Sequence, residues 1–288
     1  MNQSELIKIV ECPRDAMQGL HNFIPTADKI RYINQLLKVG FHTIDFGSFV
    51  SPKAIPQMAD TVEVLHGLDL SDTRSHLLSI VANVRGANDA AKFDAIRYIG
   101  FPFSVSETFQ LRNTNSTIEE SLDIVDEILT ICAASGKEPV IYLSMGFGNP
   151  YGDVWNAEIV MKWVSKLTEM GCKILAISDT VGIANPEGIS YLYKHLIPAY
   201  PNVEFGAHFH THQNNWKEKV EAAYKFGCRR FDCAIKGYGG CPMAKDDLTG
   251  NLPTENLISY ANGLDMDTGV DYEAFFDALV IANEIFPK

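Results

Sequence analysis

The chain has 288 residues, of which 46% are hydrophobic and 21% are charged, and its formal net charge is -12. This balance is typical of a globular protein, and the length suits one large domain. An acidic chain without a basic run is a poor partner for nucleic acid. No apolar run reaches the roughly 20 residues that a membrane helix needs. We therefore expect neither nucleic acid nor a membrane as a partner.

The cysteine pattern bears on the cellular compartment. No two of the cysteines have C-x-x-C spacing, which indicates reduced thiols and argues against a disulfide framework or a zinc site. The N-terminal residues also lack the basic and long apolar segments of a signal peptide. We therefore expect a cytoplasmic protein. The six cysteines are Cys12, Cys132, Cys172, Cys228, Cys233 and Cys241.

Eight short apolar runs, rich in β-branched and aromatic residues, are predicted strands. Between several of them, apolar residues recur at helical spacing, and one such stripe follows a capping box formed by Thr117 and Glu120. Two more helices are predicted after Thr254. The strands are predicted at residues 6–12, 42–46, 76–82, 95–101, 139–145, 173–178, 203–210 and 229–235.

Repeated strand-helix units with eight strands predict an α/β fold, a parallel (β/α)8 or TIM barrel. We expect one domain over residues 1–288, with the barrel at about 6–252 and a helical extension at about 253–288. The alternative is a doubly wound open sheet, which usually has a glycine-rich phosphate-binding turn after its first strand. Here the first strand ends in Cys12-Pro13-Arg14-Asp15, which is not such a turn.

Active sites of these barrels lie at the carboxyl ends of the strands. A single polar residue there is most often a helix cap, but nearly every predicted strand is followed by one, which together indicates a catalytic mouth. These residues are Arg14, Asp15, Gln18, Asp45, Ser48, Asn83, Arg85, Ser104, Ser106, Glu107, Tyr142, Ser144, Asp179, Thr180, His208, His210 and Lys236.

His208 and His210 lie two residues apart on a predicted strand, so their imidazoles point to the same side. An isolated pair of this kind is as often two packed histidines as half of a metal site. Asp15 adds a carboxylate and Asn251 an amide oxygen, a mixture of ligands that suits Mg²⁺ or Mn²⁺. Such an ion acts as a Lewis acid, and Arg14 beside it can stabilise a developing oxyanion.

Several segments together resemble the 3-hydroxy-3-methylglutaryl-CoA lyase family, part of a metal-dependent lyase and synthase superfamily built on this barrel. The most distinctive segment is Ser48-Phe49-Val50-Ser51-Pro52-Lys53 followed by Pro56-Gln57-Met58. The resemblance extends from about Ile7 to about Tyr260. The other matching segments are Pro13-Arg14-Asp15 with Gln18, Ser106-Glu107, Asn113 to Ser121, Ser178 to Gly182, Gly239-Gly240-Cys241-Pro242, and Gly250-Asn251-Leu252 with Thr254-Glu255.

The resemblance implies an acyl-CoA substrate that is cleaved to acetoacetate and acetyl-CoA by a retro-Claisen reaction. It implies that Arg14 stabilises the thioester enolate and that Cys241 protonates or protects it, although by spacing alone this cysteine is a small hydrophobe in a turn. Either Asp15 or His208 can serve as the base. The implied metal ligands are Asp15, His208, His210 and Asn251, and the implied supporting carboxylates are Asp45, Asp179 and Glu255.

The chain departs from the family pattern in the loops that shape the substrate pocket, at Ala16-Met17, Gly148 to Tyr151, Thr211 to Asn214 and Lys245 to Leu248. One alternative is therefore a lyase or aldolase of the same mechanism that acts on another 3-hydroxyacyl-CoA or 3-hydroxy acid. A second alternative is a non-catalytic metal or CoA binder, although such a binder needs neither Arg14 nor Cys241. The sequence leaves open whether the chain forms a homodimer.

Overall fold

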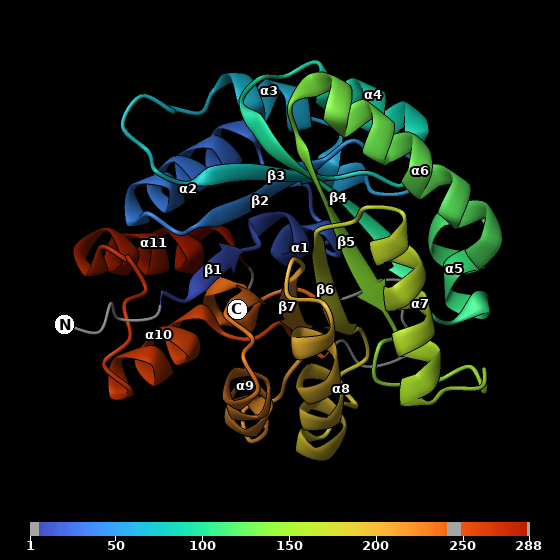
Figure 1. Ribbon diagram of the computed structural model, residues 1–288. Helices are drawn as coiled ribbons and strands as arrows, with labels where there is room; N and C mark the ends of the chain where they lie inside the picture. Colours follow the sequence, from blue (N-terminus) through green and yellow to red (C-terminus); the bar gives the residue numbers. More distant parts are fainter. Residues whose placement is uncertain (1–5, 241–248, 287–288) are drawn as a thin grey trace.

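Eight parallel strands close into a barrel in which each strand pairs with the next and β8 pairs with β1 (Figure 1). The computed structural model describes residues 6–240 and 249–286. All eight predicted strands are present, with ends shifted by a few residues. They are β1 (Lys8–Glu11), β2 (Thr43–Ser48), β3 (His76–Ile80), β4 (Ile96–Ser104), β5 (Glu138–Ser144), β6 (Ile174–Asp179), β7 (Glu204–Phe209) and β8 (Arg230–Cys233).

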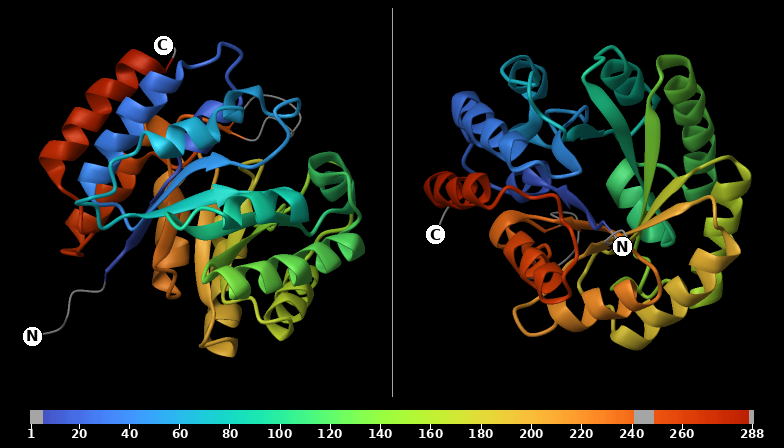
Figure 2. Two further views of the ribbon diagram at one scale, coloured as in Figure 1. Left: turned by 90° about the horizontal axis from the view of Figure 1, so that it is seen from above. Right: turned by 60° about the vertical axis from the view of Figure 1, so that its left-hand side comes forward.

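Helices surround the strands, as the second view of Figure 2 shows. The described α-helices are α1 (Pro13–Gln18), α2 (Thr26–Val39), α3 (Thr61–His66), α4 (Val84–Ala91), α5 (Glu107–Thr114), α6 (Ile118–Ser135), α7 (Ala157–Glu169), α8 (Pro186–Ala199), α9 (Trp216–Lys225), α10 (Thr254–Gly263) and α11 (Tyr272–Ile285). Two short 3-10 helices are η1 (Pro56–Met58) and η2 (Ile235–Gly237). None of the helices in the described residues combines the length and apolar character that crossing a bilayer requires.

Two local expectations meet different outcomes. The capping box is confirmed, because the Thr117 side chain accepts from the Glu120 amide while the Glu120 carboxylate accepts from the Thr117 amide. The segment that begins at Pro13, where we predicted no helix, forms the helix α1. Proline suits the first helical position because the amide it lacks would have no partner there.

The barrel interior is a packed core. Side chains that alternate inward from β3 to β6 form a separate apolar cluster, made of Leu78, Tyr98, Val140, Tyr142, Ile174 and Ala176. The larger core lies between the strands and the surrounding helices. The packed interior leaves the carboxyl ends of the strands as the place for a site.

The two C-terminal helices are present as expected. α11 lies beside α2 (Figure 1), and the Phe275 ring meets Phe41 edge-on at a centroid distance of 6.2 Å. Beyond α11, Phe286 packs against Tyr32 at 5.7 Å. This end of the chain therefore extends the outer helical layer around β1 and β2.

Candidate active site

A cavity opens at the carboxyl ends of the strands. One part of its wall is apolar, formed by Val50, Ile55, Ile80, Pro102 and Phe109. The polar part is formed by Arg14, Asp15, Gln18, Ser48, Asn113, Tyr142, Ser144, Ser178, Thr180, His208 and His210. Residues from opposite ends of the sequence therefore meet in the predicted mouth.

Three of the predicted metal ligands form one cluster. One ligand atom each from Asp15, His208 and His210 lies within 4.8 Å of the others. The fourth, Asn251, donates from Nδ2 to Asp15 Oδ2 at 2.6 Å and to the main-chain oxygen of Tyr238 at 2.9 Å. Its amide oxygen is therefore the atom left to bind a cation. One carboxylate, two imidazoles and an amide oxygen fit Mg²⁺ or Mn²⁺.

His208 has a partner that sequence reasoning missed. Its Nδ1 lies 3.1 Å from Oδ2 of Asp232, a buried residue of β8. This contact leaves Nε2 to face the cluster, the arrangement that orients histidine ligands in metal sites. Burial lowers the pKa of His208, but the hydrogen bond and charge of Asp232, together with Asp15, raise it more, so the net shift is upward. A charged residue inside an apolar predicted strand was the available signal, because a buried carboxylate needs a partner.

The other two ligands are in the ionisation states that a cation requires. Burial, followed by the nearby His208, lowers the pKa of His210 to about 4, so its imidazole is neutral at pH 7. Burial raises the pKa of Asp15, but Arg14 and the two histidines lower it more, and the net shift is downward. The cluster therefore presents one carboxylate and a neutral imidazole before any ion binds.

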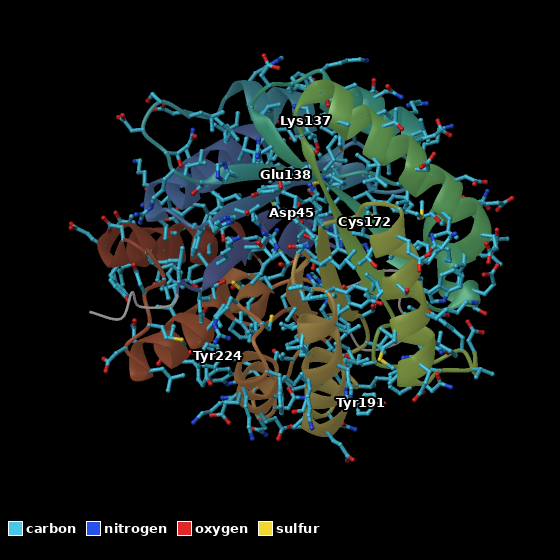
Figure 3. The ribbon with its side chains drawn as sticks, in the orientation of Figure 1. Asp45, Lys137, Glu138, Cys172, Tyr191 and Tyr224 are labelled. Atoms are coloured by element: carbon cyan, nitrogen blue, oxygen red, sulfur yellow. The ribbon has the colours of Figure 1, made fainter. Side chains whose placement is uncertain are left out.

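Arg14 is held rigidly at the edge of the cluster. Its Nε and Nη2 donate to Asp45 Oδ2 at 3.0 and 2.5 Å, and its Nη1 donates to Asp15 Oδ1 and Gln18 Oε1, both at 2.9 Å. Asp45 lies inside the ring of strands in Figure 3, whereas Tyr191 of α8 and Tyr224 of α9 lie on the outer helices. Asp45 therefore fixes the guanidinium by accepting from two of its nitrogens. This fork geometry is specific to arginine.

Two of the expected supporting carboxylates lie apart from the cluster. Asp179 pairs with Lys219 at 2.6 Å, and Glu255 accepts the main-chain amide of Lys236 at 3.0 Å. Neither carboxylate is among the residues that line the cavity. Neither carboxylate therefore faces the cluster directly, and their role in the reaction stays a prediction. Cys241 lies outside the described residues.

Several other polar strand ends serve the fold. Asn83 and Ser106 cap α4 and α5, and Glu107 accepts the first amide of α6 at 3.1 Å. Arg85 is largely exposed and faces Asp89 in the next turn of its helix. Asn83, Ser106 and Glu107 therefore satisfy helix-start amides, so only some of the strand ends form the site.

Comparison with known proteins identifies the family of this chain. The HMGL-like family model matches residues 7–281. The chain belongs to the HMGL-like family. It is 33% identical over 281 residues to 3-hydroxy-3-isohexenylglutaryl-CoA/hydroxy-methylglutaryl-CoA lyase of Pseudomonas aeruginosa, which covers 96% of this chain and 92% of the relative. It is also 33% identical to the mitochondrial hydroxymethylglutaryl-CoA lyase of Bos taurus, over 94% of this chain and 83% of that one.

Solved structures of the family have the same barrel. An HMG-CoA lyase from Acinetobacter baumannii, solved in complex with coenzyme A and 3-methylmalate, superposes with a TM-score of 0.89. The two chains are 30% identical, and the match covers 97% of this chain and 90% of that one. The eight-stranded barrel and its helices are therefore those of an HMGL-like lyase fold.

Proposed function

We propose that the chain is a divalent-metal-dependent carbon–carbon lyase that cleaves 3-hydroxy-3-methylglutaryl-CoA to acetoacetate and acetyl-CoA. The observation that carries this proposal is the Asp15, His208 and His210 cluster beside the fixed guanidinium of Arg14, in one cavity. Membership of the HMGL-like family, whose relatives of similar length are named as lyases for this substrate, supports it.

The proposed cofactor is Mg²⁺ or Mn²⁺, held by Asp15, His208, His210 and the amide oxygen of Asn251. When bound, the ion acts as a Lewis acid toward oxygens of the substrate. Asp232 keeps the His208 ring in the orientation and tautomer that presents Nε2.

The reaction requires the C3 hydroxyl to lose its proton while the C2–C3 bond breaks. The electron pair of that bond moves onto the thioester as an enolate, and C3 becomes the ketone of acetoacetate. Asp15 and His208 are the two groups of the cluster that can accept the hydroxyl proton. Arg14, already charged and held by Asp45, is placed to stabilise the enolate oxygen without reorganising.

The enolate then takes a proton at C2, which releases acetyl-CoA. From the family resemblance we assign this step, or protection of the enolate, to Cys241. Asp179 and Glu255 are proposed as supporting carboxylates that act through the main chain around the site, because Asp179 reaches His210 through Lys219 and Glu255 binds the amide of Lys236.

The test is an assay of the purified chain with Mg²⁺ and 3-hydroxy-3-methylglutaryl-CoA that measures acetyl-CoA and acetoacetate together. 3-Methylglutaryl-CoA is the matched control, because it lacks the hydroxyl whose proton must leave. The isohexenyl analogue tests whether the apolar cavity wall tolerates a longer branch. We expect equimolar release of both products, which EDTA abolishes and Mg²⁺ restores. Product release that continues unchanged in EDTA would contradict the metal-dependent mechanism.

The cellular location and assembly remain proposals. Five cysteines in the described residues are free thiols, which suits a reducing compartment such as the cytoplasm. Fractionation of the source cells tests the location, and light scattering of the purified chain tests for a homodimer.

A further inference from the structure

A fully buried lysine lies directly behind the metal cluster. Lys219, in the first turn of α9, has no exposed side-chain surface. Its ammonium donates to Asp179 Oδ2 at 2.6 Å, to the main-chain oxygen of His210 at 2.9 Å and to that of Gly182 at 3.0 Å. All three N–H groups therefore have an oxygen partner, which a buried ammonium requires.

These contacts join segments that are distant in the sequence. Asp179 ends β6, Gly182 lies in the turn after it, and His210 follows the end of β7, while α9 lies beside α8 on the outside of the barrel (Figure 1). The second oxygen of Asp179 accepts the amide of Ala184 at 3.0 Å, so both carboxylate oxygens are bound. Lys219 thus holds the turn after β6 against the end of β7.

This turn also holds the His210 main chain. The His210 amide donates to the main-chain oxygen of Asp179 at 3.4 Å, and its main-chain oxygen accepts from Lys219 at 2.9 Å. Lys219 in turn binds the Asp179 carboxylate and the main-chain oxygen of Gly182. The main chain that carries the His210 ring is therefore fixed on both sides by groups that depend on a single ammonium.

We propose that Lys219 is a positioning residue for the metal site, which keeps His210 in the orientation needed to bind the cation. This inference rests on the proposed metal-dependent function. Lys219 touches none of the cavity, so it acts only through His210 and the 179–182 turn. Loss of an outer partner of a metal ligand typically weakens metal binding by about 10- to 100-fold.

The test compares Mn²⁺ affinities, measured from the EPR signal of free Mn²⁺, for the wild type and Lys219→Met. We expect the Kd to rise by about 10- to 100-fold in the variant, and excess Mn²⁺ to restore most of the turnover. Because Lys219→Met leaves the Asp179 carboxylate buried and unpaired, the double variant Lys219→Met with Asp179→Leu serves as a second test. It removes both charges and should show the same weakening of Mn²⁺ binding.

Lys29 provides the matched control. It is also a buried lysine, bound to the main-chain oxygen of Gln57 and to Asp60 at 2.6 Å, but it lies on α2 and has no contact with a metal ligand. Lys29→Met should lower stability and leave the Mn²⁺ affinity unchanged. Unchanged affinity in a folded Lys219 variant overturns the inference alone, whereas absence of Mn²⁺ binding by the wild type overturns the proposed metal site and the inference with it.

Discussion

Glu11 makes the stability of this barrel dependent on pH. It lies at the end of β1 with no exposed surface. Its Oε1 accepts the amide of Ile235 at 2.8 Å, and its Oε2 meets the hydroxyl of Thr254 at 2.6 Å. Burial raises the pKa of Glu11 from 4.5 to about 8, although both hydrogen bonds lower it in part. The folded chain therefore retains a proton that the unfolded chain releases.

The sign and size of the effect follow from this difference. Below pH 4.5 both states are protonated, and above about pH 8 both are ionised, so stability falls as pH rises between these values. The full loss corresponds to about 5 kcal/mol. Glu11→Gln removes the titration and keeps both contacts, because the amide oxygen accepts from Ile235 and the amide nitrogen donates to Thr254. The variant should equal the wild type near pH 4.5 and exceed it increasingly up to pH 8.

Urea unfolding, followed by circular dichroism in buffers from pH 5 to pH 8, measures the difference between the two proteins at each pH. Glu63→Gln is the matched control, because Glu63 is exposed on α3, and its curve should follow that of the wild type. A difference between Glu11→Gln and the wild type that is the same at pH 5 and pH 8 would show that Glu11 is ionised in the folded chain and refute the reasoning.

Three further predictions concern single contacts. Arg14→Lys loses the fork that binds Asp45 and should lower kcat by about 100- to 1000-fold with a smaller change in KM. A change in KM alone would mean that Arg14 contributes only to substrate binding. Asp232→Asn replaces the charge beside His208 and should weaken Mn²⁺ binding by about 10-fold or more in the EPR titration, and unaltered affinity would argue against its orienting role. Thr117→Ala removes the α6 cap and should lower the free energy of unfolding by about 1 kcal/mol, with Ser116→Ala as the control and no loss as the contrary result.

The strands and their order were predictable because the signal for them is local. Each strand is a short apolar run next to a helical stripe, and parallel strands joined by helices leave few topologies. The α6 start was predictable for the same reason, since Thr117 and Glu120 bind each other's main chain within one turn. The helix at Pro13 was missed because six residues are too few to show a helical period.

The pairings of the outer residues of the site were not predictable, because each is a buried charge whose partner lies far away in the sequence, although the charge of Asp232 within an apolar strand indicated that it needed a partner. Lys219 binds Asp179, 40 residues earlier, and Asp232 binds His208, 24 residues earlier. A lysine at the start of a helix usually faces solvent, and nothing near Lys219 in the sequence marks it as buried. The pairing of β7 with β8 brings His208 to Asp232, and the packing of α9 on the barrel brings Lys219 to Asp179.

The two histidines show how closure turns an ambiguous pattern into a site. His208 and His210 alone are as compatible with packing as with metal binding. Their ligand atoms lie within 4.8 Å of that of Asp15 because β8 pairs with both β7 and β1 and so brings α1 to the end of β7. Each histidine then has its own outer support, Asp232 for one and the Lys219-bound turn for the other. A buried imidazole needs hydrogen-bond partners whether or not it binds a metal. The convergence of both rings with the Asp15 carboxylate is therefore the observation that argues for a cation more strongly than the His-x-His spacing.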